Sequence, residues 1–131
     1  GLNGYQPIWS DDFLKSLSQN KIGLNLSQGK SSNYYSSDRF SQLIGNGLLV
    51  MIDKKTKIGD FFERDEIVTY NSISDLSEKI IKYTEDNRER KRIAKKGRIK
   101  YFKYFNSKII ADFIINKTYG INKKYYWEKF L

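Results

Sequence analysis

Two short apolar segments, joined through one amphipathic helix pattern, most strongly restrict what this chain can fold into. Lys21–Leu26 (KIGLNL) and Leu48–Asp53 (LLVMID) each have the length of a β-strand and are bounded by turn-forming residues. Apolar residues recur at helical spacing over 40–44, and the Gly-Asn-Gly sequence at 45–47 provides residues that tolerate a left-handed helix end. The order strand, helix, strand predicts a right-handed βαβ unit with parallel strands.

The loop before this helix carries the candidate site. In open parallel sheets the ligand crevice lies beyond the carboxyl ends of the strands, which here places it at Ser27–Asp38. Residues 36–38 are favourable N-cap residues, so the helix start would offer unpaired N–H groups and a positive dipole end to a phosphate. Arg39 would pair with the same group, and the Gln42 amide would bind a hydroxyl. The same residue types occur at ordinary helix ends, so on pattern alone a plain helix cap stays open.

The rest of the chain predicts one more strand and four further helices. Glu66–Tyr70 (EIVTY) is β-branched and aromatic, as strands are, and 54–62 reads as a loop with a brief helical turn. The aromatic tail 121–131 would dock on the other elements. The helices are expected from Ser10 to Asn20, from a cap at Ser74 to Tyr83, from Asp86 or Asn87 to Phe105, and from Asn106 or Ser107 to Tyr119.

This pattern predicts an α/β fold in which a short parallel sheet is flanked by helices. The chain contains no internal repeat and no low-complexity linker, so residues 1–131 are expected to form a single domain. The sequence opens on GLNGY without a methionine, which indicates a fragment of a longer chain.

The amino acids that the chain lacks exclude several classes of site. There is no cysteine, which excludes disulfides, thiol nucleophiles and zinc-thiolate sites. There is no histidine, which excludes an imidazole-based hydrolase triad. No segment resembles a membrane span or a signal peptide, so we expect a cytoplasmic location. This location includes peripheral attachment to the inner face of the membrane.

The net charge of +9 predicts an anionic partner: nucleic acid, a membrane surface or a phosphorylated ligand. An A/T-biased genome would produce a similar lysine-rich surface without any such partner. Much of the charge lies in Arg88–Lys103, which contains one acid, Glu89. An apolar stripe crosses the same segment, so we expect an amphipathic helix that packs on the sheet and keeps its basic face in water. The glycine in this stripe, Gly97, indicates close packing.

Several segments together resemble a known enzyme family. They are KIGLNLS at 21–27, DRFSQLIGNGLLV at 38–50, DFFERDEIVTY at 60–70, DLSEKIIKY at 75–83 and RERKRIAKKGR at 88–98. In order and spacing they resemble the C-terminal donor-binding domain of a GT-B glycosyltransferase of group 1, of the kind found in spore-maturation CgeB-like proteins. The resemblance extends from about residue 21 to about residue 115.

The resemblance implies transfer of a sugar from a nucleotide-sugar donor to an acceptor hydroxyl, on a glycan or another molecule, with no metal and no other cofactor. Arg39 would stabilise the leaving diphosphate. Gln42 stands where the family has a glutamate that accepts hydrogen bonds from the ribose, and Tyr34 stands where many relatives have a second glutamate that contacts the sugar. The donor-binding residues implied are Lys30, Tyr34, Tyr35, Ser36, Ser37, Asp38, Arg39 and Gln42.

The family's catalytic base comes from an N-terminal domain, so this fragment is expected to contain no catalytic residue and to be inactive alone. A complete donor domain has about twice as many strands, which would leave one sheet edge bare and favour a homodimer or a covering segment. Fucosyltransferases also have a basic helix start after a tyrosine-containing loop, but their E-K motif is absent here.

Two other functions stay open. One is a non-enzymatic basic module that binds nucleic acid or an anionic surface through 88–103, although nucleic acid is the less expected partner. The other is a degenerate donor domain kept for protein contacts, as Gln42 and Tyr34 would allow.

Overall fold

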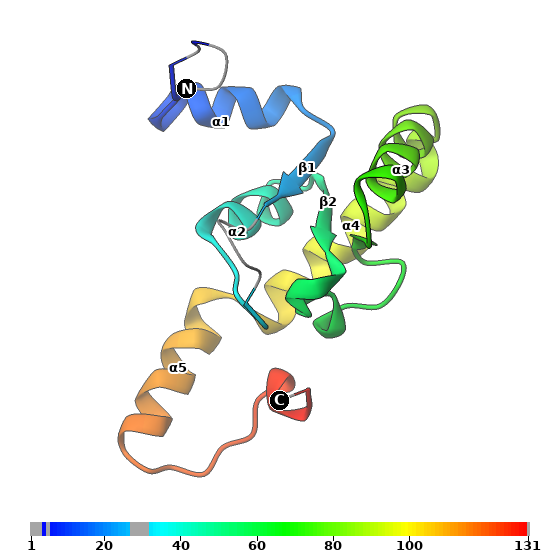
Figure 1. Cartoon of the computed structure of the whole chain (residues 1–131). Coiled ribbons are helices and arrows are strands. Elements are labelled where there is room, and N and C mark those ends of the chain that lie inside the picture. The colour runs from blue at the N-terminus through cyan, green and yellow to red at the C-terminus, as the bar shows by residue number, and fades with distance from the viewer. Residues whose placement is uncertain (1–3, 5, 27–31, 131) are drawn as a thin grey trace.

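A three-stranded parallel sheet forms the centre of the structure, a computed structural model that describes residue 4 and residues 6–26 and 32–130. The strands are β1 (Ile22–Asn25), β2 (Leu49–Asp53) and β3 (Val68–Tyr70), in the order β1-β2-β3 (Figure 1). Both pairings are parallel, with Gly23 opposite Val50 and Ile52 opposite Thr69. The predicted βαβ unit and the α/β class are therefore confirmed.

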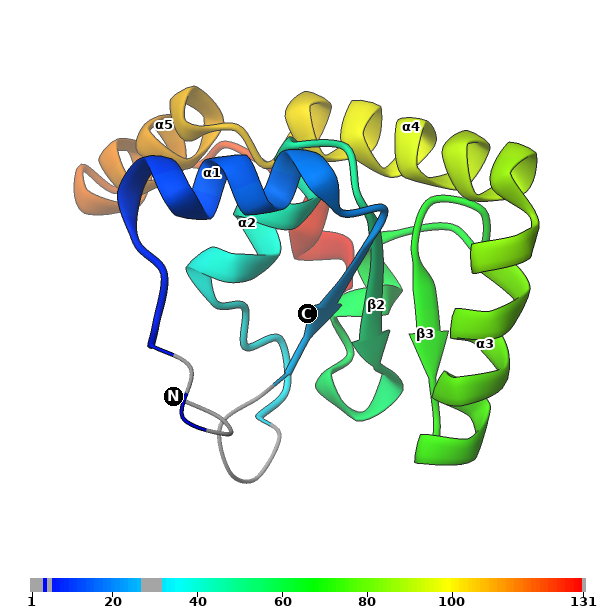
Figure 2. The same cartoon turned by 90° about the horizontal axis from the view of Figure 1, so that it is seen from above.

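Helices flank this sheet. They are α1 (Ser10–Gln19), α2 (Asp38–Gly45), α3 (Ile73–Glu85), α4 (Asn87–Tyr104) and α5 (Ser107–Thr118), with short 3-10 helices η2 (Lys54–Thr56), η3 (Ile58–Phe61) and η4 (Tyr126–Lys129). Figure 2 shows α4 running across the ends from which all three strands start, with α3 beside β3 at one end and α5 beyond the other. None of the helices in the described part of the chain is long and apolar enough to cross a membrane.

The central strand β2 is covered on both faces, because its successive side chains point in opposite directions. Leu49 and Met51 are fully buried and pack in one cluster with Ile93 and Ala94 of α4. The alternate residues of β2 pack in a second cluster with the apolar face of α2. The uninterrupted apolar run of β2 is therefore what a strand buried on both faces requires.

Helix α4 approaches the sheet closely at Gly97. A Cβ at this position would overlap the backbone carbonyl of Glu66, just before β3, and would contact the Ile44 side chain of α2. Ile93 and Ala94 are buried on the same face of α4. These contacts confirm the predicted stripe and the close packing expected at Gly97.

The helix boundaries agree with the sequence except at two starts. Asp86 caps α4 and Asn106 caps α5, each through a side-chain oxygen that accepts a backbone N–H three residues later, as expected. The expected cap at Ser74 is wrong: Ser72 is the N-cap of α3 and accepts the N–H of Asp75 at 3.1 Å. Ser72 has the extended backbone that aims its oxygen into the first turn, whereas Ser74 already lies inside the helix.

The second difference is at α1, where the expected cap Ser10 is the first helical residue and Trp9 is the N-cap. At the end of α2, Gly47 alone adopts a left-handed conformation, with φ +80°, while Asn46 has φ −82°. One left-handed residue is enough to turn the chain into β2.

The aromatic tail docks, as predicted. Trp127 is buried, and its ring stacks on Phe105 with centroids 5.7 Å apart. The hydroxyl of Tyr125 donates to Asp112 of α5 at 2.7 Å, which joins the tail to that helix. The tail therefore covers the junction of α4 and α5 with aromatic surface.

Candidate functional site

The start of α2 is held at the carboxyl end of β1. Ser37 is the N-cap residue and has an extended backbone. Its hydroxyl donates to the side-chain oxygen of Asn25 at 3.0 Å, and Asn25, the last residue of β1, is 3% exposed. The Ser37 hydroxyl accepts no N–H from the first turn and no described side chain caps α2, so the first N–H groups of the helix keep their capacity to bind an anion.

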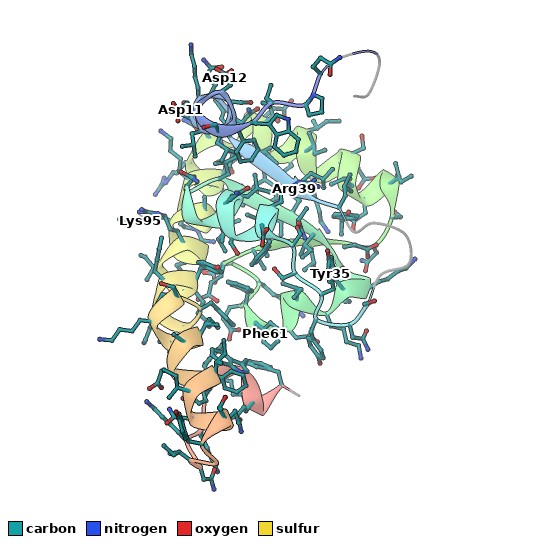
Figure 3. All side chains as sticks on the ribbon, turned by 90° about the vertical axis from the view of Figure 1, so that its left-hand side faces the viewer. Asp11, Asp12, Tyr35, Arg39, Phe61 and Lys95 are labelled. Atoms are coloured by element: carbon teal, nitrogen blue, oxygen red, sulfur yellow. The ribbon has the colours of Figure 1, made fainter. Side chains whose placement is uncertain are left out.

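A cavity of about 510 Å³ lies in front of this helix start, between α1 and α2. We call it the α1–α2 cavity. Four of the predicted site residues line it together: Ser37, Asp38, Arg39 and Gln42. Figure 3 shows Arg39 between the two helices. The helical spacing of three or four residues between 38, 39 and 42 brings these side chains to one side of α2.

The opposite wall of the α1–α2 cavity was not found from the sequence. It consists of Ile8, Trp9, Ser10 and Phe13. Trp9 is 76% exposed, which is unusual for so large an apolar side chain. An indole that lies free beside a polar helix start offers a flat surface on which a planar ring can stack. The only signal in the sequence was an aromatic residue, Trp9, directly before a helix. This signal does not reveal which other helix the Trp9 side chain faces.

The charges in this cavity are balanced. Arg39 is exposed and forms no ion pair with any described residue, so its guanidinium keeps all its donors for a ligand. Asp38 lies in the first turn of α2, where its carboxylate interacts favourably with the helix dipole but would oppose a phosphate. Of the four residues, Asp38 is therefore the least suited to direct contact with a diphosphate.

Tyr34 and Ser36 line a neighbouring cavity of about 290 Å³ instead, with an aromatic wall that includes Phe61 and Trp127. Tyr34 has a left-handed backbone, its N–H donates to the Thr56 carbonyl at 2.7 Å, and its hydroxyl donates to the Phe130 carbonyl at 3.0 Å. These bonds join the loop before α2 to η2 and to the tail. The hydroxyl of Tyr34 thus has a structural bond to the tail.

One predicted site residue that the structure describes lies apart from both cavities. Tyr35 is half exposed and lines neither of them. Lys30 lies outside the described residues.

Part of the positive charge of α4 is neutralised by carboxylates of the same chain. Arg92 pairs with Asp65 at 2.8 Å and with Glu89 at 2.7 Å, and Lys96 also pairs with Asp65. The hydrogen bonds from Lys96 and Arg92 lower the pKa of the Asp65 carboxyl from 3.8 to about 2. This side of α4 is therefore an ion-pair network that joins α4 to the loop before β3.

One comparison with known proteins identifies a family for this chain. A family model described as glycosyl transferase-like matches residues 2–116, which include all three strands and the whole α1–α2 cavity lining. Searches of curated proteins and of solved structures returned no match. Since the family model covers most of the chain, this protein belongs to the glycosyl transferase-like family.

Proposed function

We propose that this chain is the donor-binding part of a glycosyltransferase and binds the nucleotide of a nucleotide-sugar in the α1–α2 cavity. The observation that carries the proposal is the meeting of Ser37, Arg39 and Gln42 in one cavity, at a helix start tied to the carboxyl end of β1. Parallel sheets bind nucleotides at this edge. The cavity volume of about 510 Å³ lies within the range of small-molecule sites.

Each group would have a separate part in donor binding. The uncapped N–H groups of α2 and the guanidinium of Arg39 would hold the diphosphate. Gln42 would accept a hydrogen bond from the ribose through its amide oxygen. The exposed indole of Trp9 would stack on the base, a contact that the sequence did not suggest. Lys30, Tyr35 and the loop that contains them would add contacts to the base or the sugar.

The reaction would need little from this part of the enzyme beyond electrostatics. The acceptor hydroxyl attacks the anomeric carbon, the bond from this carbon to the diphosphate oxygen breaks, and the hydroxyl proton passes to a general base. Arg39 and the start of α2 would stabilise the charge that develops on the leaving diphosphate, without a metal. The base would come from an N-terminal domain, as in group 1 CgeB-like enzymes, so this chain alone would not turn over substrate.

Nucleotide binding tests the proposal. We would titrate the chain with a panel of nucleoside diphosphates and nucleotide-sugars by calorimetry and by amide NMR. Arg39→Ala should weaken binding by about 10- to 100-fold, since a charge-assisted hydrogen bond contributes roughly 1.5–3 kcal/mol. Gln42→Ala should have a smaller effect, because it removes a neutral hydrogen bond.

Arg64→Ala is the matched control, because Arg64 is also exposed and lies outside the α1–α2 cavity. It should leave binding unchanged. Equal weakening by Arg64→Ala and Arg39→Ala, or the absence of saturable binding to the whole panel, would refute the donor-site proposal.

The open side of β1 supports a second element of the proposal. Among the described strands β1 pairs with β2 alone, so its other edge has backbone groups available for pairing. We expect this edge to pair with a further strand of a larger donor domain or with a second copy of the chain. Light scattering that shows a monomer at all concentrations would rule out the second copy.

A further inference from the structure

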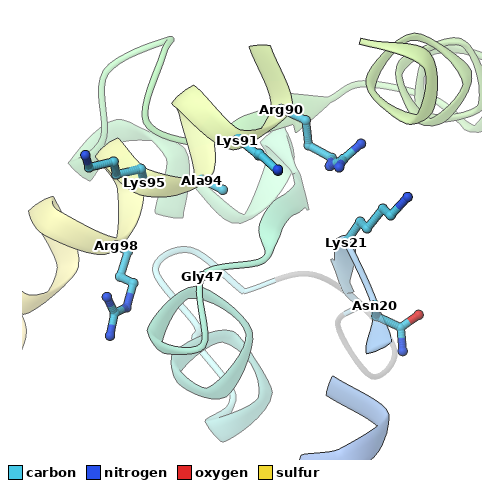
Figure 4. Close-up of a pocket in the computed structure, with 8 residues that line it drawn as sticks. All are labelled: Asn20, Lys21, Gly47, Arg90, Lys91, Ala94, Lys95 and Arg98. Carbon is cyan, nitrogen blue, oxygen red and sulfur yellow. The ribbon is translucent and has the colours of Figure 1, made fainter. Parts of the chain in front are cut away.

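A second cavity, of about 320 Å³, lies at the opposite edge of the sheet, where the strands start. We call it the amino-edge cavity. Lys21 directly precedes β1, Gly47 lies just before β2, and the remaining wall comes mainly from α4. Figure 4 shows the residues that line it: Asn20, Lys21, Gly47, Arg90, Lys91, Ala94, Lys95 and Arg98. The described residues of the lining include several cations and no carboxylate.

Two of these cations have a structural role. Arg90 donates from Nη1 to the Tyr83 carbonyl near the end of α3 at 3.0 Å, and Arg98 donates from Nε to the Gly45 carbonyl at the end of α2 at 2.8 Å. Cations are favourable at the carboxyl ends of helices. These partners are neutral groups, however, and they leave the positive charges without an anionic counterpart.

The charge of Arg90 is the least accessible to water. Arg90 is 4% exposed and forms no ion pair with any described residue; besides Tyr83, its guanidinium donates only to the side-chain oxygen of Asn87. A buried charge without a counter-ion is costly. An anion in the amino-edge cavity would offset that cost.

The acids around α4 lie away from this cavity. Asp65 and Glu66 pair with Arg92, Lys96 and Lys100 on another side of the helix. In the described part of the chain, Lys21, Lys91 and Lys95 form no ion pair. The same helix thus carries a neutralised side and a side that retains its positive charge.

Some of the cationic side chains of the amino-edge cavity point toward one another. Figure 4 shows Lys21, Arg90 and Lys91 turned toward one space between α4 and the start of β1, while Lys95 and Arg98 lie farther along the cavity. Three cations that face one another repel, and the repulsion is relieved when a multiply charged anion lies between them. The geometry therefore fits a ligand with two or more negative charges in one small group.

We propose that the amino-edge cavity binds a phosphomonoester or diphosphate group, as a second anion site separate from the proposed donor site. At about 320 Å³ the cavity is near the lower end of small-molecule sites, so it suits a phosphate-bearing head group rather than a whole nucleotide-sugar. Soluble phosphorylated metabolites and anionic lipids both present this chemistry. The experiment separates these two sources.

Inorganic pyrophosphate is the first probe. Titrated into the whole chain, it should shift the amide NMR signals of Gly47 and Ala94 in a saturable way. The double variant Lys21→Gln/Lys91→Gln should weaken this binding by at least about 10-fold, as expected for the loss of charge-assisted hydrogen bonds. Both lysines are exposed, so the dispersion of the NMR spectrum should show that the variant remains folded.

The control removes the same charge elsewhere. Lys108→Gln/Lys124→Gln changes two exposed lysines of α5 and the tail that lie outside this cavity, and it should leave the Gly47 and Ala94 shifts unchanged. Arg39→Ala should also leave them unchanged, which keeps the two sites distinguishable. Equal weakening in the control variant would show nonspecific attraction and overturn the proposal, as would saturable binding without shifts at Gly47 and Ala94.

Vesicles identify the source of the group. Cosedimentation with vesicles of phosphatidic acid in phosphatidylcholine, lost in Lys21→Gln/Lys91→Gln and displaced by pyrophosphate, would assign a lipid head group. Pyrophosphate binding without vesicle association would assign a soluble ligand. Retention on an RNA oligomer by a chain that binds neither pyrophosphate nor vesicles would overturn the proposal in favour of a nucleic-acid surface.

Discussion

The two cavities differ in how they would attract an anion. The α1–α2 cavity has one arginine beside one aspartate, an uncapped helix start and an indole wall. The amino-edge cavity has several cations, no carboxylate and little aromatic surface. The first arrangement favours recognition of a particular molecule through directed contacts, while the second favours any compact, highly charged group. The net charge of +9 is therefore a poor guide to where the family's donor would bind.

The largest effect should follow from a change in the packing of α4, which lines the amino-edge cavity and contacts α2. Gly97→Ala would force its methyl group into the Glu66 carbonyl, a backbone atom that cannot move aside easily, and would push α4 away from the sheet. We expect a loss of about 2–4 kcal/mol in the free energy of unfolding, measured by urea denaturation. Gly45→Ala is the control, since its methyl group would meet only Phe102 at an ordinary 3.9 Å. A stable Gly97→Ala variant would show that α4 can shift on the sheet.

Exchange of arginine and lysine should affect the two cavities differently. Arg39→Lys keeps the charge but loses the two-pronged geometry, and it should weaken nucleoside diphosphate binding by about 10-fold. Lys91→Arg should change pyrophosphate binding by less than about 3-fold, because the amino-edge cavity depends on charge more than on geometry. Calorimetry on both variants would measure this contrast. Similar losses at both positions would remove the distinction between the cavities.

Salt concentration should affect anion binding in the two cavities to different extents. Pyrophosphate binding in the amino-edge cavity should weaken steeply as sodium chloride rises from about 0.05 M to about 0.3 M, because its attraction comes from several exposed charges. Nucleoside diphosphate binding in the α1–α2 cavity should weaken less, because base stacking and the ribose contact are uncharged. Parallel slopes in the two titrations would contradict the proposed difference.

The smallest expected effect concerns the neutralised side of α4. The pKa of Asp65 is lowered to about 2 by Lys96 and Arg92, so its ionised form stabilises the fold. This stabilisation is complete above the unfolded value of 3.8 and is lost as the pH falls through about 2. Asp65→Asn should therefore lower the urea midpoint slightly at pH 6 and by much less at pH 2. If the urea midpoints of the original chain and the variant differ equally at both pH values, the ion pairs of Asp65 do not cause the difference.

The elements were predictable because their signals are local. Strand β2 and the stripe of α4 each follow from a period within a few residues, and the start of α2 follows from polar residues next to an apolar face. The Ser72 cap was missed because Ser72 and Ser74 are chemically alike, and only the backbone angle of Ser72 distinguishes them. The parallel pairing of β1 with β2 followed from the βαβ pattern and was confirmed.

Only the α2 wall of the α1–α2 cavity was predictable from the sequence. The residues of α2 were found together because one helix brings them together, but Trp9 and Phe13 meet them through tertiary packing that no sequence period describes. Arg90 was assigned to the basic face, yet it lies three and four residues before Ile93 and Ala94 and so continues their buried stripe. A buried position occupied by an arginine was the available signal for the amino-edge cavity.

The bond from Tyr34 to Phe130 has a consequence for synthesis of the chain. It joins residues 96 positions apart, so the loop before α2 can reach its final position only after the segment around Phe130 has left the ribosome. The family match ends at residue 116, before this segment begins. An expression fragment cut at that limit would lose Trp127 from the neighbouring aromatic cavity and the bond from Tyr34 to Phe130, although every strand and the bond from Tyr34 to Thr56 would still be present.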